Sequence, residues 1–581
     1  MTTKSTPDAK AVRLDDLPLL FAIMERLQIN TILDQHLSRH LNWAGELSIG
    51  QVVVGWLVYV LSQSDHRLNR VEDWIGKRLD VYSAAYGKSV RALDFSDDRL
   101  ADILDKLSDP ALWTKFETQL NQHLIRVYDL NPQQVRLDPS TISTYAPVNE
   151  QGLLQLGHSK DGRPGDAQLK FQLGMLDPLA LPLVTQVVGG KSADDPLYAP
   201  AIRQIQNSIG TGGKTYIGDS KMSAIGTRAF LVASGDYYLC PLGEKQLPPS
   251  EREKLIQAAV DGQVELRPIR RERIDLTSNQ PTEIEEIAEG YELQVPVATS
   301  LDLTNVQWQE RRLIIRSISS ARVEARNLDA RLTRADADLE ELTIRKQGKR
   351  RLSKEQIDQA IAKILERYRV EGLIKTCVTI AINEQDVRAY KNRGAETRAE
   401  AEIVLTIQRD EESIRNLKER MGWRFYATNH PTLELNETVL AYREQYRIED
   451  GISRLKGRPL GLSPMFLQSE SRMIGLINFL TIALRVLTLI EFQVRQGLKA
   501  EGQSLKGIYA GQKGRQSMRP STELLLDGFK EINAVVGKVK GEFFVLLDPL
   551  SEAQKRILRL LRLDDDLYQN FLSYFQKPAP G

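Results

Sequence analysis

The pattern of apolar residues changes at Val135, from helical spacing to short β runs that alternate with helices. Before this point, apolar residues recur at steps of three and four in LPLLFAIMERL, IGQVVVGWLVYVL and LADILDKL. After it come the runs VRLD, LKFQLGMLD and LPLVTQVVGG, a helix, the run TYIGD, a second helix and DYYLCPL. Strands that alternate with helices predict a mixed α/β sheet at the centre of the chain.

Two aspartates follow strands of this predicted sheet. Asp138 comes directly after VRL, and Asp219 comes directly after TYIG. The working residues of open α/β sheets lie at the carboxyl ends of strands, so both are candidate site residues. Each also has a structural alternative, because Asp138 before Pro139 is compatible with a turn and Asp219 with a helix N-cap.

The sheet pattern is interrupted between residues 244 and 420. The β-like runs there surround two charged helical segments, near 328–342 and 357–368, whose apolar residues repeat at alternating steps of four and three. Ser353 and Gln356 form a capping box for the second segment, so we predict an antiparallel helical hairpin. The cations at its tip either clamp DNA phosphates or form solvated surface; they are Arg345, Lys346, Lys349, Arg350, Arg351 and Lys354.

A helix with a carboxylate on one face is predicted over about residues 436–456, after the run WRFYATN. Tyr442, Glu449 and Lys456 are spaced seven residues apart, so at ~100° per residue they share one face. The buried stripe beside that face consists of Ile448, Ile452 and Leu455. Glu449 is therefore predicted at the edge of the core, facing a cleft; the alternative is a solvated helix face.

These residues resemble the signature of DDE transposases of the insertion-sequence-four superfamily. That signature is Tyr, two residues, Arg, three residues, Glu, six residues and Lys; it falls here on Tyr442, Gln445, Glu449 and Lys456, with Gln445 at the Arg position. The segments GHSKDGRPGDAQLKFQL and GISRLKGRPLGLSP are similar to those of a related transposase branch, and the resemblance spans most of residues 12–500. Such proteins place a β-rich insertion between the second Asp and the final Glu of an RNase H-like fold.

The resemblance implies that Asp138, Asp219 and Glu449 hold two Mg²⁺ (or Mn²⁺) ions per active site and catalyse DNA cleavage and strand transfer. Two divalent ions activate the nucleophilic oxygen and stabilise the leaving group, and Mg²⁺ prefers oxygen ligands. Three carboxylates without metal repel one another. The DNA-binding residues expected beside this triad are Tyr442, Gln445, Lys456, Arg454, Arg458, His158, Lys160 and Arg163. For the last three, a polar hairpin at the sheet edge is the alternative.

The fold class expected from these patterns is α/β: an RNase H-like core interrupted by a β-rich insertion with a helical hairpin, plus all-α N-terminal and C-terminal regions. Residues 1–130 are expected to form a helical DNA-binding or dimerisation domain and residues 499–581 a helical C-terminal domain. Residues 131–243 and 421–498 are the two parts of the core, and residues 244–420 are the insertion.

Composition limits the location and the partners. The chain has 78 Lys+Arg against 77 Asp+Glu, so a DNA surface must come from local clustering of cations. Two distant cysteines suit a reducing cytoplasm. The apolar stretch Met473–Phe492 approaches the length of a membrane span, but Arg485 near its middle favours a buried core helix. We expect a cytoplasmic, nucleoid-associated bacterial or archaeal protein without a membrane partner. Its expected partners are double-stranded DNA at transposon ends, target DNA and a second copy at synapsis.

Other functions remain open at this stage. A domesticated or inactive relative could act as a sequence-specific DNA-binding protein, a repressor or a nuclease. The presence of all three carboxylates argues against a silent protein. A structural coiled-coil protein conflicts with the aspartates that follow strands and would need a much longer heptad run.

Overall fold

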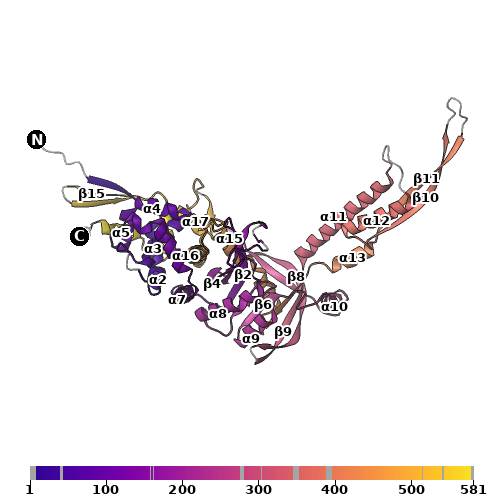
Figure 1. Cartoon of the computed structure of the whole chain (residues 1–581), viewed down its shortest axis with the longest axis horizontal. Helices are drawn as coiled ribbons and strands as arrows, with labels where there is room; N and C mark the ends of the chain where they lie inside the picture. The colour runs from indigo at the N-terminus through magenta and orange to yellow at the C-terminus, as the bar shows by residue number, and fades with distance from the viewer. Residues whose placement is uncertain are drawn as a thin grey trace.

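A nine-stranded mixed sheet lies at the centre of the chain (Figure 1). The computed structural model describes residues 8–39, 43–157, 159–160, 162–274, 281–301, 304–344, 353–387, 396–512, 514–539 and 542–576. Helices from both ends of the sequence gather on one side of the sheet, and a long arm projects from the other side (Figure 1). The prediction of a mixed α/β protein is confirmed at this level.

The strand order of the sheet is β4-β3-β2-β5-β6-β12-β9-β8-β7. Its first five strands are β2 (Gln134–Thr144), β3 (Ala167–Leu176), β4 (Leu181–Gly189), β5 (Thr215–Ile217) and β6 (Tyr237–Pro241). β2, β3 and β4 are antiparallel neighbours, whereas β5 pairs parallel with β2 and β6 pairs parallel with β5. β2 therefore stands where the pairing changes from antiparallel to parallel.

Helices cover both faces of these strands. All ten residues of β3 are buried, as expected of a strand packed on both sides. Gly174 of β3 lies against Ile205 of α8 (Tyr198–Ile209), and the next residue, Met175, lies against Gly451 of α15 (Tyr446–Lys456). Since successive side chains of a strand point to opposite faces, α8 and α15 cover opposite faces of the sheet. A further helix, α9 (Ile225–Ala233), packs against β6, β8 and β9.

The segment between β6 and β12 (Trp423–Thr428) first extends the same sheet and then leaves it. After α10 (Pro249–Val260), three strands continue the sheet: β7 (Arg267–Ile274), β8 (Pro281–Leu301) and β9 (Thr304–Ser317). The arm in Figure 1 follows, with α11 (Ile318–Thr343), α12 (Lys354–Tyr368), β10 (Ile374–Val387), β11 (Glu396–Arg409) and α13 (Glu411–Glu419).

The two helices of the arm pack through the residues that the sequence pattern placed on their seam. Leu328, Leu332 and Leu339 of α11 are buried in one cluster with Ile357 and Ile361 of α12. The predicted capping box at the start of α12 is present, since its Ser and Gln side chains each accept from the other's backbone N–H. Residues 345–352, which hold the rest of the basic tip, lie outside the described residues. Of that cluster, only Lys354 is placed.

The N-terminal and C-terminal regions share one helical body with a small sheet. The N-terminal elements are β1 (Asp8–Arg13), α1 (Leu17–Leu27), α2 (Ile29–Asp34), α3 (Ile49–Gln63), α4 (Leu68–Gly76), α5 (Leu79–Tyr86), α6 (Asp97–Leu107) and α7 (Pro110–Val127). The C-terminal elements are α16 (Glu470–Glu501), β13 (Leu505–Lys506), β14 (Gln516–Ser517), α17 (Thr522–Asp527), β15 (Asn533–Val539), β16 (Glu542–Leu547), α18 (Glu552–Leu560) and α19 (Leu567–Leu572).

The expectation that both terminal regions are all-α is wrong. β1 pairs with β15, and β15 pairs with β16, so a strand from the start of the chain completes a sheet formed by its tail. The segments NAVVGKV and EFFVLL carry β-branched and aromatic residues that favour strands. The sequence pattern of DAKAVR is too short to be recognised as a strand until its distant partner is known.

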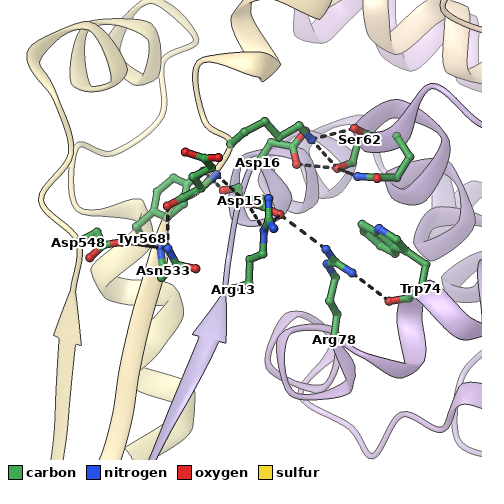
Figure 2. Close-up of polar contacts among 12 residues, drawn as sticks. Arg13, Asp15, Asp16, Ser62, Trp74, Arg78, Asn533, Asp548 and Tyr568 are labelled. Atoms are coloured by element: carbon green, nitrogen blue, oxygen red, sulfur yellow. Dashed lines mark hydrogen bonds and ion pairs between the residues drawn. The ribbon is translucent and has the colours of Figure 1, made fainter.

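Buried polar contacts fasten the two ends together (Figure 2). Lys530 Nζ donates to Asp16 Oδ2 and to Ser62 Oγ, each at 2.8 Å, and the Tyr568 hydroxyl donates to the Asp15 carbonyl at 2.7 Å. Asp16 is fully buried, so its charge depends on the ammonium and hydroxyl groups that surround it. These contacts join α3 and the residues just before α1 to the segment after α17 and to α19.

The long helix α16 is a core element. It is the one helix in the described part of the chain that is long and apolar enough to cross a membrane. Within its most apolar stretch, 94% is buried inside the molecule. Arg485 lies within it, 1% exposed, and donates to Glu117 Oε1 of α7 at 2.6 Å. The prediction of a buried core helix is confirmed.

Candidate functional site

The site begins with two neighbouring parallel strands, β2 and β5. Their register pairs Arg136 with Ile217. Asp138 stands two residues beyond Arg136 in β2, and Asp219 stands two residues beyond Ile217, just after the end of β5. The charge of Asp219 acts on Asp138. The structure therefore brings together the two aspartates that sequence analysis selected.

Asp138 lies within β2, not after it, which corrects the sequence-based expectation. β2 continues to Thr144 because β3 pairs with it along this length. The Gln133 carbonyl accepts from Thr215 N of β5 at 2.8 Å, and alternation along the strand places Pro139 on that same side, beyond the last residue of β5. Pro139 has no N–H to donate, and at this position no neighbouring strand among the described residues offers a carbonyl that would accept one.

The surroundings of Asp138 disfavour its ionised form. Burial raises the pKa of Asp138 to about 7, and the charges of Asp219, Glu449 and Asp194 add to this shift, while Lys160 opposes it. These influences show that the two predicted carboxylates and one unpredicted carboxylate lie near Asp138. Near neutral pH, an additional positive charge at this position would favour the ionised carboxylate.

Asp219 follows β5 and is held by α8 and by the backbone. The Tyr198 hydroxyl donates to Asp219 Oδ1 at 2.7 Å, and the Lys221 backbone N–H donates to the same oxygen at 2.8 Å. Tyr198 is fully buried at the start of α8. Sequence analysis missed Tyr198, because a tyrosine at the start of a helix carries no signal of its partner.

Glu449 lies on α15, in a helix that is shorter than predicted. The expected helix over 436–456 is broken at Glu444 and Gln445 into α14 (Leu435–Arg443) and α15. Tyr442 and Glu449 therefore belong to different helices, and their seven-residue spacing does not place them on one helical face. The predicted buried stripe of α15 is confirmed, since Ile448, Ile452 and Leu455 are all buried. Glu449 is exposed, yet its charge reaches Asp138.

Tyr442 still lies beside the carboxylates. Its ring packs on Tyr426 of β12 with centroids 4.7 Å apart. Burial raises the pKa of Tyr442, and the charges of Asp219 and Glu449 add to the shift. Gln445, in the break that follows, is half-buried, and its buried Oε1 atom has no hydrogen-bond partner among the described residues.

The three predicted basic residues near the end of α15 do not gather at one place. Lys456 Nζ donates to Ser140 Oγ at 3.3 Å, which places it on β2 two residues beyond Asp138. Arg454 instead pairs with Glu491 at 3.0 Å and with Glu523 at 2.8 Å, on another face of α15. Arg458 lies beyond the end of α15 and is exposed. The structure thus brings Lys456, but not Arg454, to the carboxylates.

The loop between β2 and β3 brings Lys160 to the site. Lys160 Nζ donates to the Pro139 carbonyl at 2.6 Å, and its backbone N–H donates to Thr141 Oγ1 at 2.9 Å. Arg163 points to Tyr145, donating to its hydroxyl at 2.9 Å. His158 lies outside the described residues.

Asp194 is a fourth acidic residue here that sequence analysis did not select. Its carboxylate pairs with Lys170 at 2.5 Å and with Lys160 at 3.9 Å. In the sequence it precedes a helix and is indistinguishable from a capping residue.

The donor set suits a hard divalent cation, because it consists of carboxylate oxygens. Within the ranges that the structure describes, no three His, Cys, Asp or Glu side chains form a ready cluster for a metal ion. The arrangement brings Asp219 and Glu449 close enough for their charges to act on Asp138, without a closed set of ligands among the described residues.

Comparison with known proteins gives a match to a family model and matches to solved structures. Residues 9–118 match a family model described as a domain of unknown function, DUF4277, which ends before β2. No curated protein matches the chain. Among solved structures, the chain is similar to a piggyBac transposase in a synaptic complex with hairpin DNA, at 8% identity and a TM-score of 0.36, over 99% of this chain and 89% of that one. At this TM-score the superposition is too loose to indicate a common fold or activity.

Proposed function

We propose that this chain is a DNA transposase of the DDE type, with Asp138, Asp219 and Glu449 as its catalytic carboxylates in an RNase H-like core. The observation that carries the proposal is that Asp138, within β2, and Asp219, just after the parallel neighbour β5, stand at the same offset from the paired residues Arg136 and Ile217, with Glu449 close enough to affect Asp138. The strand order also supports it, because an antiparallel β2–β3–β4 unit is continued by parallel β5 and β6 on the other side of β2.

Each residue of the site has a part in this proposal. Two Mg²⁺ or Mn²⁺ ions held by the three carboxylates would supply the activated nucleophilic oxygen and the charge relief that phosphodiester cleavage needs. Tyr198 orients Asp219 through its 2.7 Å hydrogen bond. Lys160 provides a fixed positive charge beside Asp138. Lys456, on the neighbouring Ser140, is placed to contact a DNA phosphate near the reacting one.

The second candidate is an inactive relative that binds DNA without cutting it. The crowding at Asp138 argues against it. Burial and three neighbouring acidic groups make an ionised carboxylate at this position unfavourable. A protein that only binds DNA gains nothing from this arrangement, whereas a metal-dependent nuclease uses it.

A cleavage assay tests the proposal. The substrate is a labelled DNA fragment that carries the ends of the element surrounding the gene, incubated with Mg²⁺ or Mn²⁺. We expect Asp138→Asn, Asp219→Asn and Glu449→Gln each to abolish nicking and strand joining but to retain binding in a gel shift. The triple variant should be little worse than any single one, because the residues act as a unit.

A matched control is Asp358→Asn, which removes an exposed carboxylate on α12 in the arm. It should cleave normally. Near-normal nicking by Glu449→Gln would contradict the assignment of α15, and near-normal nicking by all three variants would refute the transposase mechanism.

A further inference from the structure

A large groove lies on the side of α15 next to Glu449. Its volume is about 960 Å³, and it is lined by α15, α16, the β3–β4 turn, the end of α3 and the segment before α17. It thus forms where the terminal helical body meets the central sheet. Elements from every part of the chain except the arm and the β7–β9 extension contribute to it.

The lining of this groove is rich in arginine. Five arginines face three carboxylates there: Arg447, Arg454, Arg458, Arg495 and Arg519 against Asp450, Glu491 and Glu523. Two of the carboxylates are engaged, since Glu491 pairs with Arg454 and Arg495, each at 3.0 Å, and Glu523 pairs with Arg454. Arg447 pairs with Asp177 and Glu444, which lie outside the lining. The other four arginines still outnumber the three carboxylates, so the groove keeps an excess of positive charge.

Two of these arginines are available for a ligand. Arg458 and Arg519 are exposed, and in the described part of the chain no ion pair or side-chain hydrogen bond involves either guanidinium. Burial lowers the pKa of Arg495, and the charge of Arg519, which lines the same groove, adds to this shift. Like charges gathered in this way are stabilised by an anionic ligand.

The groove borders the candidate catalytic face. Tyr446, Asp450 and Ser453 line it, and on α15 these positions lie within about 100° of Glu449. The helix that bears Glu449 thus turns an adjoining face to the groove, and an α-helix is only ~10–12 Å across. A polyanion that reaches the carboxylates can continue directly into the groove.

We infer that this arginine-lined groove binds the sugar–phosphate backbone of duplex DNA next to the reacting phosphodiester. The inference rests on the proposed function and adds a binding surface to it. Arg458 and Arg519 contact phosphates directly. Arg454 and Arg495 are held by Glu491 and shape the wall between them. Tyr446, 49% exposed, offers an aromatic surface to the sugars or bases.

The test measures DNA binding without cleavage. The full chain is titrated in EDTA with a fluorescent duplex of arbitrary sequence over a range of salt concentrations, since phosphate contacts are independent of sequence. The variant Arg458→Gln/Arg519→Gln should bind more weakly, and its slope of log K against log salt should flatten by about 2, roughly one for each lost phosphate contact. The variant Arg458→Lys/Arg519→Lys should keep the wild-type slope.

A control with the same change of charge separates the groove from a general effect. Arg126→Gln/Arg415→Gln removes two exposed arginines elsewhere, on α7 and α13, and should leave the slope unchanged. An unchanged slope in the groove variant, with normal DNA binding by the wild type, would overturn the groove but not the proposed function. Failure of the wild-type chain to bind any duplex would overturn both.

Discussion

Asp177 accepts a 2.9 Å hydrogen bond from Arg447, the residue two positions before Glu449. The other oxygen of Asp177 accepts a 2.9 Å hydrogen bond from Arg136, the residue two positions before Asp138. Arg136 and Asp177 are almost completely buried. One carboxylate at the end of β3 therefore connects the strand that bears Asp138 with the helix that bears Glu449.

Substitution of Asp177 should separate these two elements. We expect Asp177→Asn to slow nicking by about a hundredfold, because small displacements of catalytic groups have effects of this size. DNA binding in a gel shift should persist. The measurement is the nicking rate as a function of Mn²⁺ concentration, in which a positioning role lowers the rate even at saturating metal. An unaltered rate at every concentration would show that the connection has no part in catalysis.

The high pKa of Asp138 should make the stability of the metal-free protein depend on pH. Its pKa rises from 3.8 to about 7, so the folded chain holds this proton more tightly than the unfolded chain. The destabilisation is absent below the lower value, grows as the pH rises between the two, and is complete above pH 7. Asp138→Asn removes it. We expect the melting temperature of this variant, relative to wild type, to be higher at about pH 8 than at about pH 5. A pH-independent difference would contradict this.

Lys456 should act on DNA and not on the metal. Its ammonium lies on Ser140, and Lys456→Ala leaves all three carboxylates in place. We expect weaker binding of DNA ends, with a salt slope reduced by about 1, and unchanged Mn²⁺ affinity by calorimetry. Lys456→Arg keeps the charge and should retain most of the binding. Loss of Mn²⁺ binding by Lys456→Ala would place the lysine in the metal site instead.

The buried pair of Glu117 and Arg485 should be essential to the terminal body. Burial raises the pKa of Glu117 and lowers that of Arg485, and each limits the shift of the other. Glu117→Ala leaves a buried guanidinium unpaired, and we expect a loss of about 3–5 kcal/mol in the free energy of unfolding. The combined change Glu117→Leu/Arg485→Met should lose less, because no charge is left buried. Urea unfolding of both variants makes this comparison, and equal losses would argue against the charge effect.

The sequence alone was sufficient where local periodicity coincided with burial. The strands from β2 to β6, the seam of α11 and α12, and the buried stripe of α15 all follow from apolar spacing. Arg485 in an apolar helix was also readable, because a charge there requires a protein partner. The two aspartates were selected as candidates because each follows a short β run in the sequence.

Only the tertiary structure decided which distant groups meet. Just before the break after Arg443, the Ala441 carbonyl accepts a 2.7 Å hydrogen bond from Arg136, which is buried in β2 and pairs with Asp177. The partners of Asp219 and Asp138 include Tyr198 and Asp194, whose local sequence resembles ordinary helix starts. β1 becomes a strand only by pairing with β15, more than five hundred residues later. Periodicity reports which side of an element is buried, but hydrogen bonds and charge interactions depend on distances that the chain acquires only when it folds.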